Sequence, residues 1–169
     1  MPPTPEQDAV QILLQEKTLT LPEFTAETAW VLGTMLRAKA IERRHTLVID
    51  IRRFGRPVQP LFYTALPGTT GDHARWVRRK SNTVARWQRS SYAIGLKMAG
   101  LGQTIAERYA LPAAEYTTDG GSFPINVPSA GGVIGAITLS GLASREDHEL
   151  AVEVLCEHLG IAYSDLRLK

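Results

Sequence analysis

The sequence of 169 residues has a single cysteine, Cys156, and no long apolar run. One cysteine excludes an internal disulfide, which agrees with a reducing compartment. Every apolar run is much shorter than the ~20 residues that cross a bilayer. The first residues also lack the basic segment and apolar core of a secretory signal. We therefore expect a cytoplasmic protein that has no membrane partner.

An excess of charge of one sign is also absent, because 19 lysines and arginines face 17 acids and leave a net charge of +2. A nucleic-acid-binding protein usually carries a larger basic excess, so we predict no nucleic-acid partner. Internal repeats and linkers are missing too. The length and a hydrophobic content of 44% are those of one globular domain over residues 1–169, in which the proline-rich residues 1–5 are expected to be flexible.

The order of the expected helices and strands favours an α/β fold. Helical periodicity is present over residues 6–17, 25–43, 70–94 and 103–109, and again from residue 144. Runs rich in β-branched residues predict strands over residues 46–53, 58–66, 120–127 and 132–140. Pro60 indicates that the second strand lies at an edge or contains a bulge. This order suggests a mostly antiparallel sheet flanked by helices.

The predicted helix over residues 70–94 carries a stripe of cationic and amide side chains. Its members lie within about 40° of one line on the helix and are Arg75, Arg79, Asn82, Arg86 and Arg89. Three interpretations stay open: the stripe binds the carboxylate or phosphate of a ligand, it faces solvent, or it meets acids of another subunit. On the opposite side we predict that Trp76, Val84 and Trp87 are buried, with Arg75 and Arg86 much more exposed.

Two polar residues, His73 and Lys80, interrupt the side of the helix that carries the tryptophans. Lys80 either lays its stem along the indole rings or lines a pocket and meets an acidic ligand. His73 either ligates iron or satisfies a hydrogen bond in the core. Asp50, on the first predicted strand, either pairs with Arg52 or is a buried acidic partner for Lys80.

Several segments resemble metal-binding, nucleotide-binding or catalytic motifs but have simpler structural explanations. Residues 146–149 (Glu-Asp-His-Glu) resemble a metal cluster, yet successive helical positions point in different directions. Acids in a first turn fit the helix dipole, and Ser144 with Asp147 fits a capping box. The glycines of residues 131–136 lie within a strand region and do not form a dinucleotide fingerprint. Cys156 is expected to be buried, and no spacing identifies a catalytic triad.

The motifs that remain share one consistent order along the chain. They are Val48-Ile-Asp-Ile-Arg-Arg-Phe-Gly, Leu66-Pro-Gly-Thr-Thr, Trp76-Val-Arg-Arg-Lys-Ser-Asn-Thr-Val, Arg89-Ser-Ser-Tyr, Gly120-Gly-Ser-Phe-Pro-Ile and Ser140-Gly-Leu-Ala-Ser-Arg-Glu-Asp-His-Glu-Leu. Between residues 18 and 159 the sequence thereby resembles the uncharacterised branch of the haem-degrading-domain family. The resemblance implies a five-stranded, mostly antiparallel, profilin-like sheet with helices on both faces. It also implies a cytoplasmic homo-oligomer and the binding or degradation of haem.

Two positions depart from the pattern of that family. Asp119 stands where a histidine is expected before Gly120, and Gln88-Arg89 replaces the Gly-His pair of some members. Both changes remove candidate iron ligands. His73 is the remaining candidate axial ligand in the right region, and Tyr116 is an alternative as phenolate.

The resulting expectation is haem or tetrapyrrole binding or degradation, with arginines of the stripe holding the propionates. The alternatives are a non-catalytic module that binds a small carboxylate or phosphate, and an oligomeric scaffold. Whether the protein is an enzyme stays open. The expected ligand-binding residues are His73, Arg75, Arg79, Lys80, Asn82, Arg86, Gly121, Ser122 and Phe123, with His73 as the iron ligand.

Overall fold

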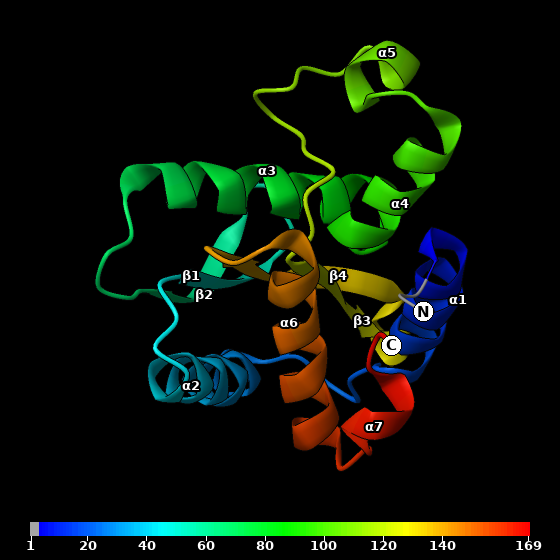
Figure 1. Ribbon diagram of the computed structural model, residues 1–169. Helices are drawn as coiled ribbons and strands as arrows, with labels where there is room; N and C mark the ends of the chain where they lie inside the picture. Colours follow the sequence, from blue (N-terminus) through cyan, green and yellow to red (C-terminus); the bar gives the residue numbers. More distant parts are fainter. Residues whose placement is uncertain (1–3) are drawn as a thin grey trace.

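An antiparallel sheet with helices on both faces organises the chain in the computed structural model, which describes residues 4–169 (Figure 1). The helices are α1 (Pro5–Thr18), α2 (Ala26–Glu42), α3 (Gly71–Trp87), α4 (Ser91–Leu101), α5 (Ile105–Tyr109), α6 (Ser144–Leu159) and α7 (Tyr163–Leu166). The strands are β1 (Val48–Arg53), β2 (Gln59–Ala65), β3 (Ser122–Val127) and β4 (Gly132–Ser140). Residues 1–3, part of the segment expected to be flexible, lie outside the described residues.

The sheet has the strand order β2-β1-β4-β3, and every neighbouring pair is antiparallel. Residues 4–169 therefore contribute four strands to it, and the five strands implied by the resemblance are wrong for this chain. The extended segment before α2 adds only one parallel bridge, between Thr20 and Asn126. Pro128 follows β3 directly and has no amide hydrogen with which to continue that ladder. In place of the expected fifth strand, the segment before α2 therefore forms only this single bridge with β3.

Strand β2 is an edge strand with a bulge, as Pro60 led us to expect. The pairing with β1 runs from Ile51 opposite Phe62 to Arg52 opposite Pro60, which leaves Leu61 as the extra residue. A proline cannot donate a ladder hydrogen bond, so it is tolerated where no further strand pairs. The proline and the bulge also discourage pairing with a foreign strand.

Helices α2 and α6 cover one face of the sheet, and α3 lies across the other (Figure 1). The main core fills the first of these spaces, where apolar side chains of the strands meet Leu32, Leu36 and Val154. Helix α2 approaches β2 closely, because a Cβ added at Gly33 would lie 2.3 Å from the ring of Phe62. Cys156 is buried in this core, as predicted.

The helix expected over residues 70–94 is in fact two helices. Helix α3 ends where Gln88 adopts a left-handed conformation with φ of 54°, and Ser90 then caps α4 by accepting a hydrogen bond from the amide of Ala93. A left-handed residue ends a helix, and serine is a preferred N-cap, so the break is local. Helix α4, helix α5 and the returning residues 110–119 form an arm beside α3, with a small core of Ile94, Met98 and Ile105 (Figure 1).

The start of helix α6 also differs from the expected capping box. Ala143 precedes the helix, and the carboxylate of Glu146 accepts a hydrogen bond of 3.3 Å from the amide of Ala143. Ser144 is already the first helical residue, so its hydroxyl does not cap the helix. Asp147 is fully buried and has other partners. Only one half of the capping box therefore forms, the hydrogen bond from the Ala143 amide to Glu146. It lies one residue earlier in the chain than predicted.

A buried histidine connects α6 to α1 and to the C-terminus. The amide nitrogen of Gln15 donates to Leu166 O at 2.7 Å, so its carbonyl oxygen must accept the 2.8 Å hydrogen bond from His148 Nε2. His148 Nδ1 is consequently unprotonated, and it has no partner within residues 4–169. Burial, helped by the charge of Arg145, lowers the pKa of His148 to about 3.

We predict that this histidine makes folding pH-dependent. Its folded-state pKa lies below the unfolded value of 6.5, so the stabilisation is complete above pH 6.5 and is lost as the pH falls from 6.5 toward 3. The full effect is on the order of 5 kcal/mol. Urea denaturation should show that the stability difference between wild type and His148→Gln shrinks steadily from pH 7 to pH 4. A constant difference would contradict the assignment.

Candidate functional site

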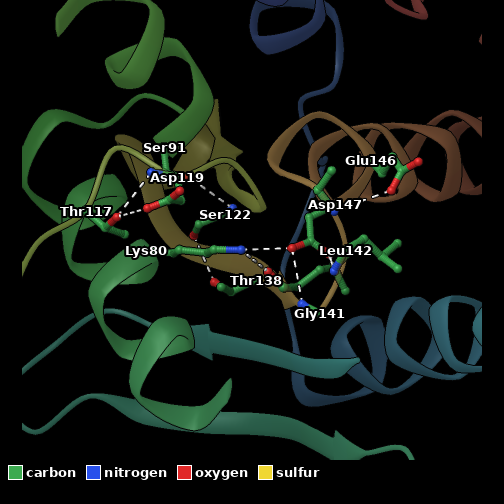
Figure 2. Close-up of polar contacts among 12 residues, drawn as sticks. Lys80, Ser91, Thr117, Asp119, Ser122, Thr138, Gly141, Leu142, Glu146 and Asp147 are labelled. Carbon is green, nitrogen blue, oxygen red and sulfur yellow. Dashed lines mark hydrogen bonds and ion pairs between the residues drawn. The ribbon is translucent and has the colours of Figure 1, made fainter. Parts of the chain in front are cut away.

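A buried ion pair joins α3 to the first turn of α6. Lys80 Nζ lies 2.9 Å from Asp147 Oδ2 and donates a second hydrogen bond of 2.9 Å to Leu139 O (Figure 2). The two charged side chains are only 5% and 0% exposed. Lys80 therefore reaches an acid of its own chain, and its stem does not simply lie along the tryptophans.

The carboxylate of Asp147 is held by more than the ammonium. The backbone amides of Leu142 and Gly141 donate to it at 3.2 and 3.4 Å. Burial raises the pKa of Asp147 above its usual value, and the ammonium and the two amides act in the opposite direction. Asp50, the other acid considered for Lys80, instead pairs with Arg52 at 2.6 Å, which confirms the simpler prediction.

Gly121 gives Lys80 the space to reach Asp147. Its φ is +124°, and a Cβ there would lie 2.5 Å from Leu139 O and 2.8 Å from Lys80 Nζ. Any side chain at this position would thus displace the ammonium as well as strain the backbone. Gly121, expected to bind a ligand, serves the ion pair directly.

The ion pair borders a cavity of about 230 Å³ that we call the polar hollow. Its lining includes His73, Trp76, Lys80, Asp119, Ser140 and Ser144. His73 and Lys80 were expected on one side of the helix, and both do line this hollow. Residues from α3, from the end of β4, from the start of α6 and from the segment before β3 thereby come together.

The ring of His73 takes part in the cap of its own helix. Its Nδ1 accepts a 3.0 Å hydrogen bond from the backbone amide of Thr70, the residue that precedes α3. An amide nitrogen only donates, so the neutral ring carries its proton on Nε2 and presents a donor. Iron needs a nitrogen lone pair, and ligation through Nε2 would require the proton to move to Nδ1 at the expense of the cap. His73 in this arrangement does not fit an axial ligand of haem.

Asp119 contributes an acceptor where the family pattern has a histidine. Its backbone amide and one carboxylate oxygen both bond to the hydroxyl of Thr117 (Figure 2). Its second carboxylate oxygen makes no hydrogen bond within the described part of the chain. The hollow therefore combines donors at Lys80 and His73 with an acceptor at Asp119.

Several residues expected to bind a ligand have structural partners instead. Asn82 donates to Glu115 O at 2.9 Å, and Ser122 shares a 2.8 Å hydrogen bond with Thr138. Phe123 is buried against the ring of His148. These three do not line the polar hollow.

The exposure of side chains along α3 agrees only in part with the prediction. Arg75 and Arg86 are exposed and Val84 is buried, whereas Trp76 is 37% exposed and Trp87 is half-buried. The burial of both tryptophans was wrong, because the side of α3 that packs on the sheet instead carries Val77, Lys80, Ser81, Thr83 and Val84. Trp76 instead supports the guanidinium of Arg79, 4.2 Å from its ring centroid.

Asp147 was the main omission from the predicted site. Its position in the first turn suggested a role in the helix dipole and in a capping box with Ser144. However, it lies three, four and seven residues before Leu150, Ala151 and Val154, which are buried. This spacing puts Asp147 on the buried side of α6 and is a signal that the sequence contained.

Within residues 4–169, no group of three or more histidine, cysteine, aspartate or glutamate side chains gathers closely enough to hold a metal ion. The helices of this same region include none with the length and apolar character of a membrane span.

The architecture defines an α/β protein with an antiparallel sheet between helical layers. The chain belongs to the family described as haem degrading protein HbpS-like, whose profile matches residues 24–156. It is 53% identical over 161 residues to a UPF0303 protein of Burkholderia mallei (strain NCTC 10229), a match that covers 95% of each chain.

Solved structures share the fold. The Ybr137w protein superposes with a TM-score of 0.82 at 29% identity, covering 90% of this chain and 87% of that one. A PduOC:Heme complex superposes with a TM-score of 0.65 at 14% identity, covering 79% of this chain and 93% of that one. The second likeness shows the fold alone.

We predict strong coupling between Lys80 and Asp147. Lys80→Met or Asp147→Leu alone should cost about 3–5 kcal/mol, because each leaves an uncompensated buried charge. The double variant should cost much less than the sum of the two, since it buries no charge. Urea denaturation of the wild type and the three variants measures this coupling. Strictly additive losses would show that the pair does not act as a unit.

Proposed function

We propose that this chain binds a small carboxylate or phosphate ligand in the polar hollow. The observation that carries the proposal is the buried ammonium of Lys80, which lines the hollow. It has three N–H donors, and among residues 4–169 only Leu139 O and Asp147 Oδ2 accept from it. His73 Nε2–H supplies a second donor. Charge-assisted hydrogen bonds to an anionic oxygen are about twice as strong as neutral ones.

The charges at the hollow favour binding of modest affinity, in which the direction of the hydrogen bonds selects the ligand. Asp147 already balances the charge of Lys80, so an anion would be recognised by the placement of donors more than by net charge. The buried pair holds the ammonium in place before any ligand arrives, which lowers the ordering cost of binding. The size of the hollow, about 230 Å³, suits the head group of a small molecule.

Acetate and inorganic phosphate are suitable first probes. Titration of the full chain, followed by amide NMR, should shift resonances at Ser140 and Ser144. His73→Phe should weaken binding at least tenfold, because a hydrogen bond to a charged group contributes about 1.5–3 kcal/mol. His45→Phe is the matched control and should have no effect. The double variant Lys80→Met/Asp147→Leu, which buries no charge, should abolish binding. Unchanged affinity in that double variant would rule out the proposed site.

Haem binding is the second candidate function, and family membership favours it. Cationic residues such as Arg75 and Arg86 are exposed and are suited to propionates. The donor set argues against iron ligation, since the lone pair of His73 is used by Thr70 and Asp119 replaces the family histidine. We therefore rank haem below a small anion.

A haem titration separates the two candidates. We expect wild type and His73→Ala to give the same Soret band, because the capping bond leaves His73 no free lone pair. His45→Ala serves as the control for loss of an imidazole. A histidine-type Soret shift in wild type that disappears only in His73→Ala would establish His73 as the ligand and overturn our ranking.

We further propose that the protein forms a homo-oligomer. Trp30 on α2 and Tyr63 on the edge strand β2 are 59% and 53% exposed. Large exposed aromatic side chains are enriched where proteins associate. Light scattering should give a mass above that of one chain, and a monomer mass at every concentration would exclude association.

A further inference from the structure

A second cavity, of about 470 Å³, lies beneath the arm next to the polar hollow. Apolar side chains such as Met98, Ile105 and Ala113 provide most of its surface, and polar residues such as Gln103 and Thr118 line the rest. We call this cavity the apolar hollow. Its volume falls within the roughly 300–1,000 Å³ typical of small-molecule sites, and the polar hollow alone falls below that range. Asp119 lines both cavities, so the two are adjacent at this residue.

The border between the hollows carries a guanidinium with spare donors. Arg79 stacks on Trp76, which lines the polar hollow, while Arg79 itself lines the apolar hollow. It donates one long hydrogen bond, of 3.4 Å, to Tyr116 O. Its Nε is buried and has no partner in the described chain.

At Asp119, where the two hollows adjoin, a ligand group that donates a hydrogen bond would be favoured. Thr117 occupies one oxygen of Asp119, and the other has no hydrogen-bond partner within residues 4–169. A hydroxyl or an ammonium group would satisfy it. The order across the site is therefore donors at Lys80 and His73, an acceptor at Asp119, and an apolar space beyond.

We infer that the ligand is a 2-hydroxy or 2-amino carboxylic acid with an apolar side chain. This inference rests on the proposed function, because the carboxylate binds at Lys80 and His73. The hydroxyl or ammonium on the adjacent carbon donates to Asp119, and the side chain enters the apolar hollow beside Met98. The three chemical features of the ligand then match the three parts of the site in their spatial order.

Four acids test this assignment by calorimetry on the full chain: glycolate, 2-hydroxyhexanoate, 2-aminohexanoate and hexanoate. Affinity should rise from glycolate to 2-hydroxyhexanoate by about fourfold for each methylene that becomes buried. Hexanoate should bind at least tenfold more weakly than the better of its two substituted forms, because it leaves Asp119 unpaired. Comparison of the hydroxy and amino acids identifies which donor the site prefers.

Two variants and a matched control locate the contacts. Ala113→Leu, which fills part of the apolar hollow, should weaken the preferred six-carbon acid at least tenfold. Ala114→Leu makes the same change at the neighbouring residue, which does not line that hollow, and should leave the affinity unchanged. Asp119→Ala should remove the advantage of the substituted acid over hexanoate.

The outcomes separate this inference from the proposed function. If glycolate binds but a longer chain adds no affinity, the inference is wrong and the small-anion site stands. If the gain from the longer chain persists in Ala113→Leu, the side chain binds elsewhere and the inference is also wrong. If none of the four acids binds, the inference is wrong, and the titration with inorganic phosphate then decides whether the small-anion site stands.

Discussion

The buried pair of Lys80 and Asp147 joins the helical layers on the two faces of the sheet at one end of that sheet. Removing two charges from water costs several kcal/mol each, and attraction offsets this only when the remaining hydrogen-bonding groups are satisfied. Here the carbonyl of Leu139 and two backbone amides after β4 satisfy most of these groups and leave one N–H of Lys80 without an acceptor in residues 4–169. The turn from β4 into α6, and the glycine at position 121, are therefore fixed by the requirements of one interaction.

The same pair gives the neighbouring cavity its chemistry. An ammonium that is held by two acceptors keeps a fixed position beside the cavity, which a solvent-exposed lysine does not. Around it, the cap of α3 fixes the tautomer of His73, and Thr117 orients Asp119. Each of these side chains is set by an interaction within the fold, so the site is organised without a ligand.

Family membership and local chemistry point to different ligands in this protein. The HbpS-like profile and the shared fold fix the architecture, but a fold hosts many functions and the donor set decides among them. An imidazole with its lone pair engaged and a carboxylate in place of a histidine are poor partners for iron. Both are compatible with the small organic acid that we propose as the ligand.

The sequence by itself determined the features that depend on neighbours along the chain. The strands and the edge position of Pro60 follow from periodicity and local residue types, and the spacing of Asp50 and Arg52 suggested their pairing as one of two alternatives. The tertiary structure alone decided the partner of Lys80, which lies 67 residues away, and the exposure of Trp76. Local signals cannot settle these, because the energy of a buried charge or an aromatic ring depends on which helix docks against which end of the sheet.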